Sequence, residues 1–171
     1  RIVLHIDGGG KAGRTKWLLE KIAPLHFDYD VLGLSFYPAW GDSFDALKQN
    51  LSDAVPFADK DVLIAETSYP WHALPDIKGG TPIMRWPTTP VGQAQFLHDL
   101  IQLLHGVPDH RGIVFVYWFP EAIPTPKIRR VWRQGYEALF DSHGNALPAL
   151  DGMNTQEETF SMSRSSSNLR S

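Results

Sequence analysis

The sequence has 171 residues and a formal net charge of −3; 43% of its residues are hydrophobic and 20% are charged, which is ordinary for one soluble globular domain. This balance lacks the strong basic footprint of a nucleic-acid-binding protein, and no apolar run approaches the ~18 residues of a membrane span. The chain has no cysteine, which excludes disulfides and cysteine-ligated metals.

Four short, almost continuously apolar runs predict β-strands that are covered on both faces. They lie at residues 2–6, 31–35, 62–65 and 113–117. Amphipathic stretches predict helices at residues 15–22, 43–55, 92–104 and 127–136. This alternation predicts an α/β protein with a parallel sheet, either an open doubly wound layer or a (β/α)8 barrel. Because the chain begins inside a strand, without an initiator methionine or a signal peptide, we expect an N-terminal part of the protein to precede it.

Two segments depart from this rhythm. Residues 67–91 form a long loop that contains five prolines and several aromatic residues, and long ordered loops are commonly functional. Residues 152–171 are rich in Ser, Thr and Asn, so we expect a polar, disordered tail after a single domain at residues 1–151.

The stretch "LHIDGGGKAGRT" places Gly8, Gly10 and Gly13 in the GxGxxG frame of dinucleotide-binding loops. The next strand, however, is followed by "SFYP", which has no carboxylate for a ribose, and Arg14 occupies the position of a P-loop lysine. We therefore predict a tight strand-to-helix loop and no nucleotide site.

Polar and aromatic residues gather at the carboxyl end of every predicted strand. These are His5 and Asp7, Ser35 and Tyr37, Glu66, and Tyr117 and Trp118. Barrel enzymes and open α/β sheets both place their sites at this edge. His5 alone is compatible with a structural histidine and Asp7 with a loop cap, but Glu66 follows "VLIA", where a carboxylate is costly without partners. Carboxylates beside aromatic rings favour sugar binding.

The motifs "DVLGLSFYPAW", "KDVLIAETSYPW" and "GIVFVYWFPEAIP" resemble the second half of glycoside hydrolase family 53, the endo-β-1,4-galactanases that cut the galactan of pectic arabinogalactan. The resemblance covers about residues 2–150. It implies strands five to eight of a (β/α)8 barrel and a retaining, two-glutamate hydrolase of β-1,4-galactan. It also implies a secreted or periplasmic location. We assign no cofactor and no metal ligands to this site, and calcium binding stays open.

The resemblance assigns roles to individual positions. It implies that Glu66 is the catalytic nucleophile, that Tyr37 hydrogen-bonds it, and that Trp118 forms the floor of the adjacent sugar subsite. The remaining substrate-binding candidates are His5, Asp7, Ser35, Trp40, Tyr69 and Trp71.

The chain also departs from the family pattern. It reads "AWGD" where the family usually has "FWHG", and Phe119 replaces a glutamate in "YWFP". The family's acid/base glutamate lies in an Asn-Glu pair, which this sequence lacks. We therefore expect a missing N-terminal half-barrel to supply the acid/base and the fragment alone to be inactive. Two alternatives stay open: a non-catalytic galactan-binding protein, and a glycosidase of the same clan that acts on another β-glycan.

Overall fold

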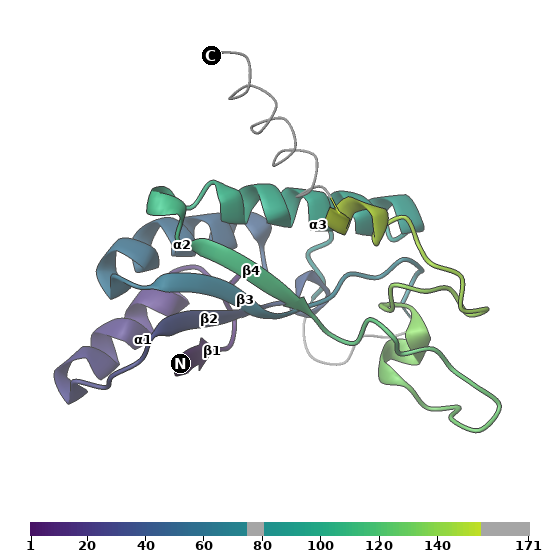
Figure 1. The fold of residues 1–171 in the computed structure, drawn as a ribbon, viewed down its shortest axis with the longest axis horizontal. Helices are drawn as coiled ribbons and strands as arrows, with labels where there is room; N and C mark the ends of the chain where they lie inside the picture. Colours follow the sequence, from purple (N-terminus) through teal and green to yellow (C-terminus); the bar gives the residue numbers. More distant parts are fainter. Residues whose placement is uncertain (75–80, 155–171) are drawn as a thin grey trace, which may run out of the picture.

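The computed structural model describes residues 1–74 and 81–154, and its centre is one parallel sheet (Figure 1). Its strands are β1 (Val3–Ile6), β2 (Val31–Phe36), β3 (Asp61–Thr67) and β4 (Gly112–Tyr117). They are hydrogen-bonded in the order β1-β2-β3-β4, so neighbours in sequence are neighbours in the sheet. All four predicted strands are confirmed.

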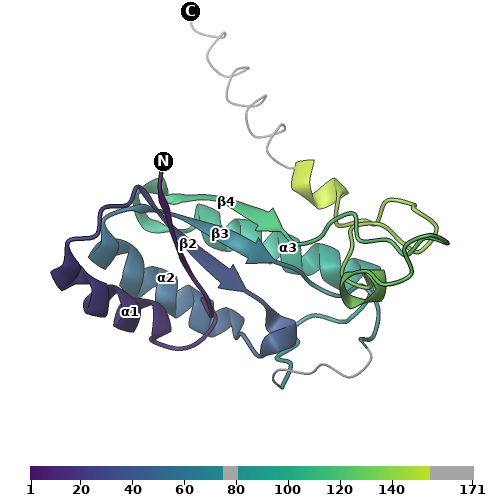
Figure 2. The ribbon, with the colours of Figure 1, turned by 90° about the horizontal axis from the view of Figure 1, so that it is seen from below.

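Three α-helices connect the strands. They are α1 (Arg14–Ile22), α2 (Phe44–Ala58) and α3 (Pro90–His105). Seen from below, all three lie on the same face of the sheet (Figure 2). A doubly wound sheet carries helices on both faces, whereas sequential parallel strands with helices on one face correspond to half of a (β/α)8 barrel. The structure thus selects the barrel alternative.

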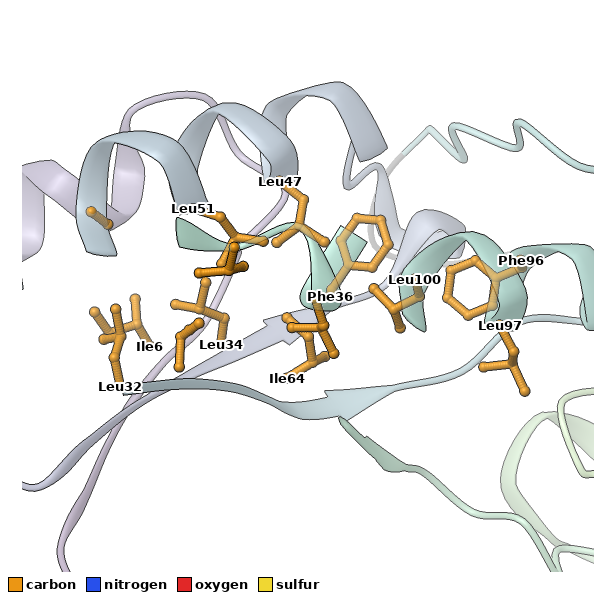
Figure 3. Close-up of a cluster of buried hydrophobic side chains, with 14 of the residues drawn as sticks. Ile6, Leu32, Leu34, Phe36, Leu47, Leu51, Ile64, Phe96, Leu97 and Leu100 are labelled. Carbon is orange, nitrogen blue, oxygen red and sulfur yellow. The ribbon is translucent and has the colours of Figure 1, made fainter. Parts of the chain in front are cut away.

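The main core lies between the sheet and the helices (Figure 3). Successive strand side chains point to opposite faces, so Leu32, Leu34 and Phe36 of β2 all point toward the helices, where each is fully buried. Leu47 and Leu51 of α2 cover them. Burial of each such side chain stabilises the fold by roughly 1.5–3 kcal/mol. This packing fixes the strand ends that carry the site.

The opposite face of the sheet is apolar but uncovered in the described residues. Val3 of β1 and Val114 and Val116 of β4 are 43%, 48% and 48% exposed. In a closed (β/α)8 barrel this face is the packed interior. The described residues therefore leave the barrel interior open, with β1 and β4 as its two edge strands.

The helix predicted at residues 127–136 is wrong. The structure has only the 3-10 turn Trp132–Gly135 (η4) in this region. Arg133 and Gln134 have positive φ angles of 47° and 57°, and Gly135 has φ 84°, which no α-helix accommodates. This turn brings the Trp132 indole to a buried partner, Glu137, as described below.

The described chain ends in a further 3-10 turn, Asp151–Asn154 (η5), and Met153 packs against the core. The tail predicted to be disordered lies, from residue 155 onward, outside the described residues, and the domain boundary at 151 stays a prediction. Within residues 1–74 and 81–154, no helix has the length and apolar character that crossing a bilayer requires.

Candidate active site

A register shift in the sheet places Glu66 at the carboxyl ends of the strands. Leu34 of β2 pairs with Ile64 of β3, but the next residue, Ser35, pairs with Glu66, so Ala65 is an extra residue in β3. Such a bulge re-aims the side chains beyond it. Without it, Glu66 would alternate onto the helix side with Ile64. With it, Glu66 lies beside Ser35, and Thr67 takes the buried position instead.

Tyr37 holds the Glu66 carboxylate. Its hydroxyl donates a hydrogen bond to Glu66 Oε2 at 3.2 Å, and its ring is buried, with the residue only 4% exposed. Burial, followed by the negative charge of Glu66, raises the pKa of Tyr37 well above its usual value. Tyr37 is thus a neutral donor throughout the physiological range.

Asp42 fixes the turn that carries Tyr37, a role that sequence analysis did not identify. Its Oδ2 accepts the Tyr37 backbone N–H at 2.8 Å, and Lys11 Nζ lies 3.3 Å from its Oδ1. Burial raises the pKa of Asp42, while the Tyr37 N–H and the Lys11 ammonium lower it. No motif marked this residue, because its partners are set by the folding of the turn after β2.

The other candidates at the ends of β1 and β2 lie at the same edge of the sheet as Tyr37. His5 Nε2 and Ser35 Oγ lie 2.8 Å apart, so the two side chains form a bonded pair. A cavity of about 330 Å³ is lined by Asp7, Tyr37 and Trp40 together with the glycine-rich loop between β1 and α1, which we call the glycine loop. The structure therefore brings His5, Asp7, Ser35, Tyr37 and Trp40 to one edge of the sheet, next to Glu66.

A row of aromatic rings continues from this edge. The Tyr37 and Trp40 ring centroids are 4.9 Å apart, and Trp40 meets Trp132 edge-on at 5.7 Å. The Phe119 ring centroid lies 6.4 Å from that of Trp132 and 4.4 Å from that of Trp118. Sequence analysis identified Trp40 and Trp118, named Phe119 only as a departure from the family pattern, and missed Trp132. Phe119 and Trp132 both belong to the irregular segment after β4.

The structure places one candidate, Tyr69, in the core. Tyr69 is fully buried, its ring stacks on Phe96 at 4.7 Å, and its hydroxyl donates to the Trp86 carbonyl oxygen. Burial raises the pKa of Tyr69 to about 12. Tyr69 is a core residue, because the chain turns toward α3 directly after β3.

Trp71 connects two loops. Its indole N–H donates to the Gly135 carbonyl oxygen at 3.0 Å, and its ring meets Tyr136 edge-on at 5.8 Å. The long loop after β3 is thereby attached to the segment after β4. A role for Trp71 in substrate binding stays a prediction.

Glu137 is a buried carboxylate that sequence analysis missed. It is 2% exposed, and its Oε2 accepts hydrogen bonds from Ser68 Oγ at 2.8 Å and from Trp132 Nε1 at 3.0 Å. Burial raises the pKa of Glu137, and Ser68, Arg133 and Trp132 lower it. The one available signal was a single charge in the otherwise apolar "YEALF".

The glycine loop is tight, and several of its backbone N–H groups donate hydrogen bonds within the protein. The N–H groups of Gly9 and Lys11 donate to backbone oxygens, and Gly13 N–H donates to the buried Asn50 Oδ1 at 3.0 Å. Asn50 Nδ2 in turn donates to the carbonyl oxygens of Gly9 and Lys11 at 2.6 and 2.7 Å. A phosphate-binding loop must leave such N–H groups free, so this geometry supports the prediction of no nucleotide site.

Within the described ranges, no group of three or more His, Asp or Glu side chains could hold a metal ion. The family of the chain follows from its sequence as a whole: the family model described as "Glycosyl hydrolase family 53" matches residues 1–153. The chain belongs to glycosyl hydrolase family 53.

Curated relatives of this family 53 chain include two bacterial proteins. An arabinogalactan endo-beta-1,4-galactanase of Cellvibrio japonicus (strain Ueda107) is 33% identical over 163 residues, covering 88% of this chain and 42% of the relative. An uncharacterized protein in the bgaB 5' region of Niallia circulans is 30% identical over 167 residues, covering 90% and 44%. The chain thus spans less than half the length of these relatives.

Solved structures agree with the assignment to family 53. The Ignisphaera aggregans GH53 catalytic domain superposes with a TM-score of 0.75 at 29% identity, covering 89% of this chain and 45% of that one. A structure from a study of two fungal beta-1,4-galactanases gives a TM-score of 0.71 at 24% identity, with 89% and 47% covered, and shows the fold alone. Four strands and about 45% coverage make this family 53 chain half of a (β/α)8 barrel.

Proposed function

We propose that this chain is the carboxyl-terminal half of a retaining endo-β-1,4-galactanase and that Glu66 is its nucleophile. The observation that carries the proposal is the Tyr37–Glu66 hydrogen bond of 3.2 Å at the carboxyl ends of the strands, in a family 53 chain. The row of aromatic rings beside it fits the apolar faces of galactose units. Those relatives whose names give an activity are galactanases.

In the proposed reaction, a Glu66 oxygen attacks the anomeric carbon while the bond from that carbon to the leaving oxygen breaks. A second carboxylic acid protonates the leaving oxygen, and a galactosyl-enzyme ester remains. Water then attacks the anomeric carbon, the second carboxylate takes its proton, and Glu66 is released. The Tyr37 hydroxyl fixes the orientation of the attacking carboxylate.

The second carboxyl must lie about 5–5.5 Å from the nucleophile in a retaining enzyme. Two buried carboxylates near Glu66 are already used, since Asp42 accepts the Tyr37 N–H and Glu137 accepts from Ser68 and Trp132. We therefore assign the acid/base to a further half-barrel that this chain does not contain.

Two observations support such a half-barrel. The inner face of the sheet exposes Val3, Val114 and Val116, and unpaired edge strands of this kind need a partner. An apolar groove of about 450 Å³ also runs beside β4, between Leu104 of α3 and Leu139.

Because galactan is a polymer too large to enter a cell, we place the complete enzyme outside the cytoplasm.

The proposal is tested in the longer protein, with the upstream half-barrel present. Glu66→Gln is expected to abolish hydrolysis of β-1,4-galactan while galacto-oligosaccharide binding, followed by titration calorimetry, stays nearly unchanged. Glu121→Gln is the matched control, because Glu121 is an exposed glutamate of the segment after β4. Retained turnover in Glu66→Gln would remove Glu66 from the nucleophile role.

A further inference from the structure

A closed circuit of contacts passes through Glu66, and Glu137 completes it. From Glu66 the circuit runs through the Tyr37 hydroxyl to the Trp40 ring and then to the Trp132 ring. The Trp132 indole N–H donates to Glu137 at 3.0 Å. The same Glu137 oxygen accepts from Ser68, which lies two residues after Glu66 along the chain.

Glu137 joins two segments that are otherwise far apart in sequence. Its bond to Ser68 spans 69 residues and reaches the end of β3, whereas its bond to Trp132 closes a local turn. An almost fully buried carboxylate is costly unless it is hydrogen-bonded. Here two donors on one oxygen offset that cost, one from the segment after β3 and one from the segment after β4.

The backbone between Trp132 and Glu137 is strained in a way that serves this contact. Arg133 and Gln134 have φ 47° and 57°, in the left-handed region that such residues rarely adopt. Strain of this kind persists only where the surroundings enforce it, and it is typical of functional sites. The turn places the Arg133 guanidinium 5.3 Å from the Trp40 ring and 5.5 Å from the Trp132 ring.

We propose that Glu137 is a positioning residue that holds Trp132 edge-on against Trp40 and so fixes the aromatic side of the sugar-binding cleft relative to Glu66. The inference rests on the proposed galactanase function. Glu137 itself touches no reacting atom: it acts through Trp132, and its loss lets the indole leave the position in which it contacts sugar. The effect is on substrate binding and not on the chemical step.

The test compares KM and kcat for galacto-oligosaccharides in the longer protein. Glu137→Ala and Trp132→Phe, which both remove the indole hydrogen bond, are expected to raise KM by roughly three- to tenfold, the effect of displacing one aromatic contact. The change in kcat is expected to stay within about twofold. Glu137→Gln, which keeps an acceptor oxygen, is expected to restore KM. Glu121→Ala, in the same segment but exposed, is the control.

A double-mutant cycle separates positioning from general stability. In a Trp132→Ala background, Glu137→Ala is expected to raise KM no further, although it still lowers the melting temperature. Full additivity of the KM effects would overturn the proposal. So would an unchanged KM in Trp132→Phe, which keeps the Ser68–Glu137 bond and is therefore expected to fold even if Glu137→Ala does not.

An NMR readout is independent of turnover. The Trp132 indole N–H resonance, assigned by its loss in Trp132→Phe, is expected to move upfield in Glu137→Ala and to stay close to its original position in Glu137→Gln. No shift in either variant would overturn the positioning role. A wild-type protein without galactanase activity, or an active Glu66→Gln variant, would overturn the proposed function instead, and the indole resonance would still decide the role of Glu137.

Discussion

Replacing Tyr37 by Phe removes one hydroxyl and little else. The Tyr37 ring is buried against Trp40, and its hydroxyl makes one described hydrogen bond, the 3.2 Å bond to Glu66 Oε2. Phenylalanine fills the same space, so the fold is retained. Glu66 is only partly buried, and water can replace the lost donor. The free energy of unfolding is therefore expected to change by less than about 1 kcal/mol.

The effect on catalysis is larger because an unconstrained carboxylate must be reoriented for attack. A hydrogen bond to a charged group contributes about 1.5–3 kcal/mol, and the length of this one places it at the lower end. A loss of about 1.5 kcal/mol corresponds to roughly tenfold in kcat/KM. Since burial keeps the pKa of Tyr37 far above neutrality, the same factor is expected at pH 5 and at pH 9.

The assay measures reducing ends released from β-1,4-galactan by the longer protein, alongside urea unfolding. Tyr136→Phe is the matched control, because in the part of the chain that the structure describes the Tyr136 hydroxyl makes no hydrogen bond, and the variant keeps the ring that packs on Trp71 and His72. A kcat/KM for Tyr37→Phe within twofold of wild type, in a stably folded protein, would refute the orienting role.

Three further predictions concern the scaffold. Asn50→Ala removes three hydrogen bonds to the glycine loop and is expected to lower the free energy of unfolding by about 3 kcal/mol in urea titrations; a loss below about 1 kcal/mol would contradict this accounting. Titration with ATP or NAD is expected to give no measurable binding, because the N–H groups of Gly9, Lys11 and Gly13 already donate within the protein, and a defined dissociation constant would disprove it. The raised pKa of Glu137 means that its contribution to stability is greatest below the ordinary value of 4.5 and is lost as pH rises through the folded-state pKa. Urea unfolding across that range is therefore expected to show wild type losing stability relative to Glu137→Gln, and the opposite trend would contradict the sign of the shift.

The sequence by itself determined the four strands, three of the four predicted helices and the edge of the sheet at which the candidate residues gather. Continuous apolar runs predicted all four strands, because a strand covered on both faces has no room for polar side chains. Glu66 stood out for the same reason, as a carboxylate directly after such a run. The resemblance carried by "ETSYP" and "SFYP" then gave the family, which the match over residues 1–153 confirms.

Only the tertiary structure decided which side chains meet. The bulge at Ala65 turns Glu66 toward Ser35, and it depends on how β3 pairs with its neighbour. Tyr69, a substrate-binding candidate in the sequence, packs in the core instead. Glu137, which no sequence pattern marked, is a buried carboxylate that bonds Trp132 of the aromatic row. A bond such as Ser68–Glu137 spans 69 residues. Local propensity contains no information on such a pair, because the pairing is set by how the whole sheet and its loops pack.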